Sequence, residues 1–320
     1  MELMLTKPGT RLGLNNGKVE VRKDGVVIGK HPAAIIGSLI CFPGVHPNES
    51  VISQVSRNGG SIVFLSSTGR IKSMLVGAGD IGNVKSRIQQ FASFAVDDIC
   101  LELARLIVKA KIHNMDRFKN EFSAEINDEL KKLKNTVLGI DSISNLRGVE
   151  GLATRVYFSE LRKRIPQNHR SNKRVKRFGG DALNQVQSFA YTLLHHTMIG
   201  LIHGAGLDPY LGFYHQPSYN HAALASDLME SYRAQVCDRI ILRVFKTSNF
   251  LQELAGRSVD GKMLSPGALS ILRKAYTKRL QEEVAHNGER KSFLRLMLGD
   301  VFSLRRFLNR EQPGFVPWMR

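Results

Sequence analysis

The sequence predicts an α+β protein in which a small β-rich N-terminal domain precedes a larger all-helical domain. In the first ninety residues, short apolar runs of strand length are separated by turn-forming residues. After Gly82, apolar residues recur every three or four positions, which is the period of an α-helix. We place the boundary near residue 84, so that the two domains span residues 1–84 and 85–320.

Two hairpins and one short helix account for most of the N-terminal part. Asp24-Gly25 is a strong signal for a β-hairpin turn between two apolar runs. Gly69 separates two later runs in the same way, and Asn48–Asn58 predicts the helix. The runs expected to form strands are 19–22, 26–28, 35–42, 61–65 and 71–76.

Helical periodicity continues from Gly82 to the end of the chain. Its first stretch is marked by Ile99, Leu103, Leu106, Ile107 and Ala110. Similar patterns predict helices over 120–135, 148–165, 181–203, 221–245, 266–287 and 290–310. The tail holds Pro313, Pro317 and Trp318, and disorder is one expectation for such a terminal segment.

The charge of the chain points to a polyanionic partner. Lys and Arg total 46 against 28 Asp and Glu, which gives a formal net charge of +18. A chain this basic repels itself unless an anion binds it. Nucleic acid is the first candidate and an anionic membrane surface the second, while surplus Lys kept for solubility is the alternative explanation.

Neither export nor membrane insertion is expected. The N-terminus lacks the long apolar stretch of a signal peptide. The most apolar stretch, residues 91–110, is interrupted by Asp97, Asp98, Glu102 and Arg105. The 3 cysteines are scattered and odd in number, which favours a reducing compartment over a disulfide framework or a zinc knuckle. We therefore expect a cytoplasmic protein without a membrane segment.

Positive charge concentrates between Arg155 and Arg177, where Glu160 is the only acidic residue. Residues 166–178 have no apolar periodicity and predict a loop between two helices. We expect this basic segment to contact DNA phosphates, and a solvated surface loop is the alternative. The residues expected to contact DNA are Arg162, Lys163, Arg164, Arg170, Lys173, Arg174, Lys176 and Arg177.

Three places combine metal-binding residue types with an unusual context, and the first is Glu150. It lies between Gly148 and Gly151, which permit close approach of a ligand. Beside it runs an apolar helical stripe formed by Val149, Leu152, Ala153 and Val156. The alternative is that Glu150 stands in the first turn of a helix and complements the helix dipole.

The other two places are His215 and the pair Asp227 and Glu230. His215 ends a turn-rich, aromatic segment, where a lone His is more often structural. Asp227 and Glu230 lie three residues apart on one helix face, and a cation would relieve their repulsion. A simple ion pair with Arg233 is the alternative. Together Glu, His and Asp or Glu suit Mg²⁺ or Mn²⁺, and the set lacks the thiolates of structural zinc.

Several motifs follow one another along the chain. They are Lys109–Asn114, Gly148–Gly151 with Tyr157-Phe158, Asp181–Asn184, Ala205–Phe213 with His215, and Asp227–Glu230. In this order they resemble the CRISPR-associated adaptation integrase and endonuclease family, the family numbered first among the CRISPR-associated proteins. The resemblance covers nearly the whole chain, and several motifs in one order are more specific than any one of them.

This resemblance implies a β-sandwich-like N-terminal domain that forms a homodimer and a helical domain that carries the catalytic site. The family's metal ligands fall on Glu150, His215 and Glu230, because the family uses the fourth position of the Asp-x-x-Glu element. Asp227 then supports these ligands or is the alternative one. His215 is either a ligand or a general base, and both roles stay open.

The resemblance also implies a reaction and its partners. The family inserts spacer DNA into the repeat array together with a small companion, the second-numbered CRISPR-associated protein. In this phosphoryl transfer a 3′-hydroxyl attacks a phosphodiester beside the metal ion. Basic side chains of the 162–177 segment and Arg239 would add positive charge that stabilises the reacting phosphate. Rival functions are a metal-dependent nuclease of branched DNA repair intermediates, a non-catalytic DNA-bridging protein and, as the weakest, a membrane-surface role.

Overall fold

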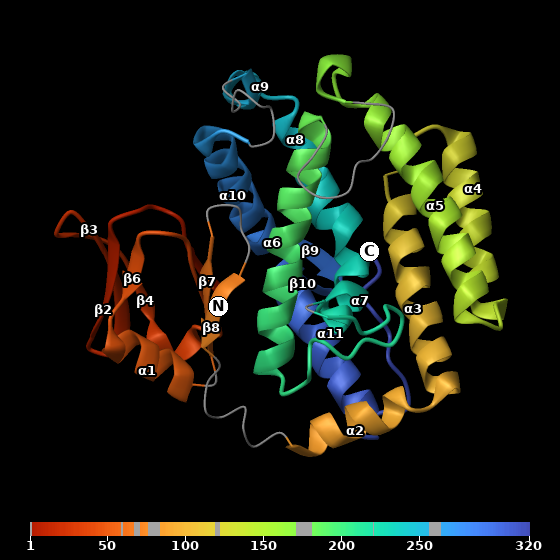
Figure 1. Ribbon diagram of the computed structural model, residues 1–320, viewed down its shortest axis with the longest axis horizontal. Helices are drawn as coiled ribbons and strands as arrows, with labels where there is room; N and C mark the ends of the chain where they lie inside the picture. The colour runs from red at the N-terminus through yellow and green to blue at the C-terminus, as the bar shows by residue number, and fades with distance from the viewer. Residues whose placement is uncertain are drawn as a thin grey trace.

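The computed structural model has a strand-rich part and a larger helical part that pack side by side (Figure 1). The strand-rich part comes first in the chain, and the helices follow. The order of strands and helices therefore agrees with the predicted α+β class. The structure describes residues 2–58, 60–66, 71–75, 84–118, 122–170, 181–219, 221–255 and 264–320.

Two four-stranded sheets form the strand-rich part in a β-sandwich-like arrangement. The sheet with the order β4-β3-β2-β6 consists of β2 (Thr10–Asn15), β3 (Lys18–Lys23), β4 (Val26–Pro32) and β6 (Val45–Pro47). The sheet with the order β1-β5-β7-β8 consists of β1 (Glu2–Leu5), β5 (Ser38–Cys41), β7 (Ser61–Leu65) and β8 (Ile71–Leu75). The helix α1 (Glu49–Arg57) contacts both sheets.

Local sequence signals explain the hairpin and the helix of this part. Asp24 and Gly25 have φ angles of 50° and 80°, as the two central residues of a type I′ turn require. They join β3 to β4 in antiparallel pairing. Asn48 caps α1, because its side chain accepts a hydrogen bond from the backbone of Val51 at 3.0 Å. The predicted hairpin and helix are confirmed.

The strands β5 and β7, at the centre of the sheet β1-β5-β7-β8, are buried on both faces. Leu39 and Ile62 belong to the core enclosed by the two sheets and α1. Their chain neighbours Ile40 and Val63 belong to the larger core of the helical part. Because successive side chains of a strand point to opposite faces, a strand buried on both faces needs a continuous apolar run. The runs in β5 and β7 are of this kind.

Most of the remaining chain is helical. The helices are α2 (Val84–Phe94), α3 (Asp97–Asp116), α4 (Ala124–Thr136), α5 (Ile143–Lys163), α6 (Ala182–Gly204), α7 (Ala223–Tyr232), α8 (Arg239–Val244), α9 (Ser248–Ala255), α10 (Pro266–Gln281) and α11 (Phe293–Leu308). Every residue of α7 is buried, because α3, α6 and α11 all pack around it. Throughout the described ranges, no helix combines the length and apolarity needed to cross a membrane.

Three of the predicted helices begin, break or end elsewhere in the structure, and α9 was not predicted. α5 begins at Ile143, earlier than expected, where the Ser142 side chain caps its first turn. The helix expected over 221–245 is interrupted by a π-helical turn at Arg233–Asp238. The helix expected over 266–287 ends at Gln281, and a hairpin of β9 (Glu283–His286) and β10 (Glu289–Ser292) follows. The division into domains at residue 84 stays a prediction, and α2 begins at that position.

The C-terminal tail is ordered and is anchored by the buried side chains of Phe315 and Trp318, so the expectation of disorder is wrong. Trp318 is 2% exposed. Its ring stacks on Tyr232 with centroids 5.3 Å apart and meets Phe293 edge-on. Its backbone N–H donates to Asp300 Oδ2 at 2.9 Å, and the Tyr232 hydroxyl donates to the same oxygen at 2.7 Å. The tail thereby joins α7 to α11.

We expect Trp318→Ala to lower the free energy of unfolding by about 3–5 kcal/mol, because it leaves a cavity between α7 and α11. Val316→Ala is the matched control, since Val316 lies in the same tail but is 64% exposed. Its expected effect is below about 0.5 kcal/mol. Urea unfolding of both variants measures the difference. Equal losses would mean that the tail does not pack as described.

Candidate active site

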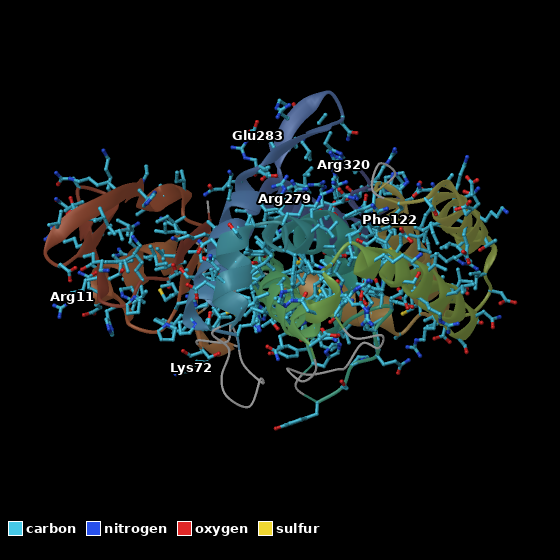
Figure 2. The ribbon with its side chains drawn as sticks, turned by 90° about the horizontal axis from the view of Figure 1, so that it is seen from above. Arg11, Lys72, Phe122, Arg279, Glu283 and Arg320 are labelled. Atoms are coloured by element: carbon cyan, nitrogen blue, oxygen red, sulfur yellow. The ribbon has the colours of Figure 1, made fainter. Side chains whose placement is uncertain are left out.

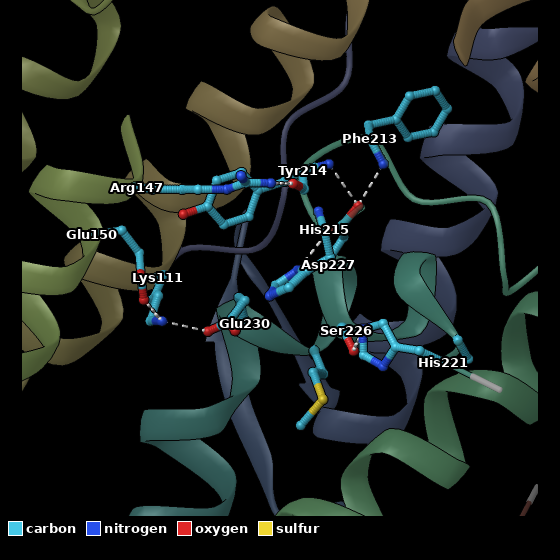
Figure 3. Close-up of polar contacts among 12 residues, drawn as sticks. Lys111, Arg147, Glu150, Phe213, Tyr214, His215, His221, Ser226, Asp227 and Glu230 are labelled. Atoms are coloured by element: carbon cyan, nitrogen blue, oxygen red, sulfur yellow. Dashed lines mark hydrogen bonds and ion pairs between the residues drawn. The ribbon is translucent and has the colours of Figure 1, made fainter. Parts of the chain in front are cut away.

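Side chains from three helices and one loop meet in the interior of the helical part (Figure 3). Glu150 comes from α5, and Asp227 and Glu230 come from α7. His215 lies in the loop between α6 and α7. Lys111 of α3 lies between Glu150 and Glu230. Four of these five residues were predicted as site residues, whereas Lys111 was quoted only as part of the motif Lys109–Asn114.

The loop that carries His215 lies closely against α7. A Cβ atom on Gly212 would fall 2.7 Å from the carbonyl carbon of Ala223 and 2.8 Å from Asp227 Oδ2, so only glycine fits there. Immediately after Gly212, the backbone N–H groups of Phe213 and Tyr214 donate to Asp227 Oδ2 at 2.6 and 3.0 Å. The backbone of α7 and one carboxylate therefore determine the path of the loop.

Asp227 also orients the His215 ring. Its Oδ1 accepts the backbone N–H of His215 at 2.8 Å and lies 2.7 Å from His215 Nδ1. This contact assigns the proton to Nδ1, which leaves Nε2 as the ring nitrogen that can bind an external group. In Figure 3 the ring points from Asp227 toward Glu230. Asp227 uses both oxygens in these contacts, which favours a positioning role for it.

Glu230 is buried and lies between two cationic side chains. Arg233 NH1 is 3.1 Å from Glu230 Oε1, and Lys111 Nζ is 2.8 Å from Glu230 Oε2. Burial raises the pKa of Glu230, but the charges of Arg233 and Lys111 outweigh burial and lower this pKa to about 2. The sequence left an ion pair between Glu230 and Arg233 as the alternative to a metal site. This ion pair is present, and Lys111 forms a second one with Glu230.

Glu150, on α5, is a second partner of the Lys111 ammonium. Its Oε1 forms an ion pair with Lys111 Nζ and accepts a hydrogen bond from Thr154 Oγ1 at 2.8 Å. Because α5 begins at Ile143, Glu150 stands beyond the first turn of the helix. The alternative explanation by the helix dipole therefore does not apply to this residue, since that effect is confined to the terminal turn.

Lys111 belongs to the motif Lys109–Asn114 quoted for the resemblance, but no role in the site was predicted for it. Its side chain is 5% exposed. On α3 it stands four residues after buried Ile107 and four before buried Met115, a position at which periodicity calls for an apolar side chain. A Lys at an apolar position of a helix indicates a buried ion pair. Acidic residues and histidines alone do not reveal such a pair.

The donor atoms fit a hard divalent ion. Throughout the described part of the chain, no three His, Cys, Asp or Glu side chains already stand close enough together to hold a metal. However, the carboxylates of Glu150 and Glu230 face one position that accommodates the Lys111 ammonium, and the ring of His215 points toward Glu230. Two carboxylates and one imidazole around a cation position are a suitable set for Mg²⁺ or Mn²⁺.

The residues expected to contact DNA are only partly within the described ranges. Lys163 and Arg164 lie at the end of α5 and pair with Glu160 at 2.9 and 3.4 Å. Arg162 is in the same turn, and Arg170 follows a short 3-10 turn. Lys173, Arg174, Lys176 and Arg177 lie outside the described residues. Basic side chains also lie on the strand-rich part, where Arg11 stands at one end of the molecule in Figure 2.

Arg239 is held by protein groups. Its Nε donates to Gln235 Oε1 at 3.1 Å, its NH2 donates to the carbonyl of Arg117 at 3.0 Å, and its guanidinium lies 4.4 Å from the Phe118 ring centroid. These contacts give the side chain a structural role. The DNA-binding role of Arg239 stays a prediction that its contacts do not favour.

Known proteins resemble this chain over most of its length. The family model described as CRISPR associated protein Cas1 matches residues 3–278. The protein named CRISPR-associated endonuclease Cas1 1 from Francisella tularensis subsp. novicida is 32% identical over 315 residues, 94% of each chain. The protein of the same name from Moorella thermoacetica is 30% identical over 300 residues, 89% of this chain and 87% of that one.

Solved structures share the fold. A Cas1 protein from Thermotoga maritima has a TM-score of 0.77 at 22% identity and covers 96% of this chain and 97% of its own. A partial Cas6-RT-Cas1–Cas2 complex gives 0.76 at 23% identity and covers 100% and 98%. A casposase bound to integration product gives 0.67 at 17% identity and covers 98% and 97%. The predicted fold class, a strand-rich N-terminal region followed by a mostly helical one, is confirmed.

We expect Asp227→Asn to lower the free energy of unfolding by about 1–3 kcal/mol, because an amide nitrogen would face N–H donors that the carboxylate now accepts. It should also lower the population of the Nδ1-protonated tautomer of His215, which ¹⁵N NMR of the imidazole measures. Asp208→Asn is the control: Asp208 Oδ1 accepts one backbone N–H, from Tyr210 at 2.8 Å, and an amide oxygen can replace it. A wild-type His215 protonated on Nε2 alone would contradict this geometry.

Proposed function

The chain belongs to the Cas1 family of CRISPR-associated proteins, and on that premise we propose that it is a metal-dependent DNA integrase and endonuclease of CRISPR spacer acquisition. The observation that best supports this is the pair of carboxylates, Glu150 and Glu230, around one cation position, with the His215 ring directed toward Glu230. The curated relatives are named endonucleases. The net charge of +18 suits a DNA substrate.

Glu150, His215 and Glu230 would hold the metal ion, with His215 binding through Nε2. Mg²⁺ and Mn²⁺ both prefer such oxygen-rich sites and both accept one imidazole. When bound, the ion would supply Lewis-acid stabilisation of the charge that develops on the phosphoryl oxygens. Asp227 would keep His215 in the tautomer that presents Nε2. Its four contacts support this positioning role over that of a ligand.

The proposed reaction exchanges one phosphodiester for another. The oxygen of a spacer 3′-hydroxyl attacks a phosphorus atom of the repeat, and the bond from phosphorus to the neighbouring 3′-oxygen of the repeat breaks. The attacking hydroxyl loses its proton, and the departing 3′-oxygen gains one. Since the bond type is conserved, no nucleotide cofactor is needed. With water as the attacking group, the same residues would give cleavage, which agrees with the name of the curated relatives.

Basic side chains would hold the DNA by its phosphates. Arg162, Lys163, Arg164 and Arg170 stand near the C-terminal end of α5, the helix that also carries Glu150. Lys173, Arg174, Lys176 and Arg177 follow in the sequence and extend the positive charge. Binding through phosphate contacts releases counterions, so we expect affinity to fall steeply with salt.

The proposed macromolecular partners are double-stranded DNA and the small companion Cas2. Two solved neighbours are a casposase bound to integration product and a partial Cas6-RT-Cas1–Cas2 complex, which supports both partners by analogy of fold. Such a reaction acts on the repeat array of the chromosome, so we propose a cytoplasmic location.

We also propose a homodimer formed by residues 1–84, with 85–320 as the catalytic part. The support is an apolar edge: Val26 and Ile28 of β4 are 65% and 54% exposed, and β4 is a terminal strand of its sheet. An exposed apolar edge strand favours pairing with another chain.

A strand-transfer assay tests the proposed function. A short duplex with free 3′-hydroxyl ends is incubated with a supercoiled plasmid carrying a repeat array, with Mn²⁺ or Mg²⁺ and with or without the companion. We expect joined products that EDTA abolishes and that Glu150→Ala lowers at least about 100-fold, because a metal ligand is lost. Glu102→Ala, an exposed Glu on α3, is the control and should be active. Cleavage of the plasmid without joined products would favour a nuclease of branched DNA. DNA binding without cleavage or joining would favour a non-catalytic DNA-bridging protein.

Ile28→Lys tests the dimer. We expect the substitution to shift the chain from dimer to monomer in sedimentation velocity, because a charge at the β4 edge opposes pairing of two copies. Val316→Lys places the same charge at another exposed apolar position, in the C-terminal tail, and should leave the dimer intact. A dimer that tolerates Ile28→Lys would place the interface elsewhere.

A further inference from the structure

Lys111 is a charged residue on the buried face of α3. Its side chain is 5% exposed and lies in one stripe with buried Ile107 and Met115. An ammonium that leaves water costs several kcal/mol unless charged partners replace the water. The presence of Lys111 in this position is therefore explained by its partners.

These partners are two of the proposed metal ligands. Nζ of Lys111 lies 2.8 Å from Glu230 Oε2 and forms an ion pair with Glu150 Oε1 as well. Arg233 NH1 lies 3.1 Å from the other oxygen of Glu230. Two cationic side chains thus neutralise two carboxylates without any metal ion.

A divalent ion held by the same two carboxylates cannot share this position with the ammonium. Mg²⁺ binds oxygen ligands at about 2.1 Å, and the ammonium already lies within ion-pair distance of an oxygen of each carboxylate. A metal beside Lys111 and Arg233 would also set four positive charges against the two carboxylates of Glu150 and Glu230. Metal binding therefore requires the ammonium to leave at least one carboxylate.

We propose that the Lys111 ammonium occupies the divalent-ion position between Glu150 and Glu230 in the metal-free protein, and that the metal binds by exchange with it. This inference rests on the proposed function, because it takes Glu150 and Glu230 as ligands. Lys111 is thus a positioning residue: it keeps the two carboxylates together before the metal arrives. It also lowers the affinity of the free protein for metal.

The exchange couples metal binding to DNA binding. A displaced ammonium needs a new anionic partner, and a DNA phosphate near the metal supplies one. DNA should therefore raise the affinity for metal, and metal should raise the affinity for DNA by the same factor, because the coupling between two binding equilibria is reciprocal.

Lys111→Met tests the exchange, since Met is also long and unbranched but uncharged. We expect the full-length variant to lose thermal stability in EDTA and to regain it in Mn²⁺, because two unpaired carboxylates repel until a cation separates them. In calorimetric titrations without DNA it should bind Mn²⁺ about tenfold more tightly than wild type, the equivalent of about 1.4 kcal/mol.

Lys134→Met is the matched control. Lys134 also pairs with a buried acid, Asp116, at 3.9 Å, but it is not part of the cluster. Its substitution should change neither the affinity for Mn²⁺ nor the response of thermal stability to Mn²⁺. A Lys111→Met variant that binds Mn²⁺ no more tightly than wild type, or that stays destabilised in Mn²⁺, would overturn the exchange and leave Lys111 as a structural residue.

The wild-type chain provides a readout that does not depend on the variant folding. Labelling of Lys111 by an amine-acylating reagent is quantified by mass spectrometry relative to Lys134. We expect protection in EDTA and stronger labelling in saturating Mn²⁺, as the ammonium leaves its buried position. Unchanged labelling at a Mn²⁺ concentration that saturates the calorimetric isotherm contradicts the proposal.

Glu150→Ala separates this inference from the proposed function. If Glu150→Ala binds Mn²⁺ as wild type does, the assigned ligands are wrong and both proposals fail. If Glu150→Ala loses Mn²⁺ binding while Lys111→Met gains no affinity, the metal site stands and only the exchange fails.

Discussion

A buried ammonium between two carboxylates is the interaction on which the arrangement of the helical part depends. Lys111 connects α3 to α5 through Glu150 and to α7 through Glu230. Arg233 provides the second positive charge at Glu230. Removing one member of such a cluster leaves an uncompensated buried charge, which typically costs about 3–5 kcal/mol. The same charges that hold three helices together surround the position at which we propose that a metal ion binds.

The helix α7 organises both halves of the candidate site. Glu230 faces the cation, and Asp227, one helical turn earlier, holds the loop that carries His215. Because every residue of α7 is buried, its position is determined by α3, α6 and α11. Catalytic groups on a packed helix are held more precisely than groups on a free loop. Here even the loop residue His215 takes its orientation from the helix.

The sequence predicted features that depend on neighbours in the chain and missed those that depend on distant partners. Asp24-Gly25 forms a turn and Asn48 caps a helix through residues next to them in the chain. The hairpin and the helix were both predicted correctly. Asn287-Gly288 is an equally local hairpin signal, but polar flanking residues hid the short strands beside it. The role of Lys111 comes from Glu150, 39 residues away, and that of Trp318 from Tyr232 on α7. Periodicity within one helix does not identify such partners.

The most direct test of a divalent-metal site is anomalous diffraction at the manganese edge from crystals of the full chain soaked in MnCl₂. The account predicts a peak between the carboxylates of Glu150 and Glu230, within bonding distance of His215 Nε2, with the Lys111 ammonium moved away from at least one carboxylate. The Asp227 carboxylate should still accept hydrogen bonds from the His215 ring and from the backbone N–H groups of the loop. A peak at another cluster of the protein, or a fully occupied ion on Asp227 with Lys111 still between Glu150 and Glu230, would contradict the assignment of the site.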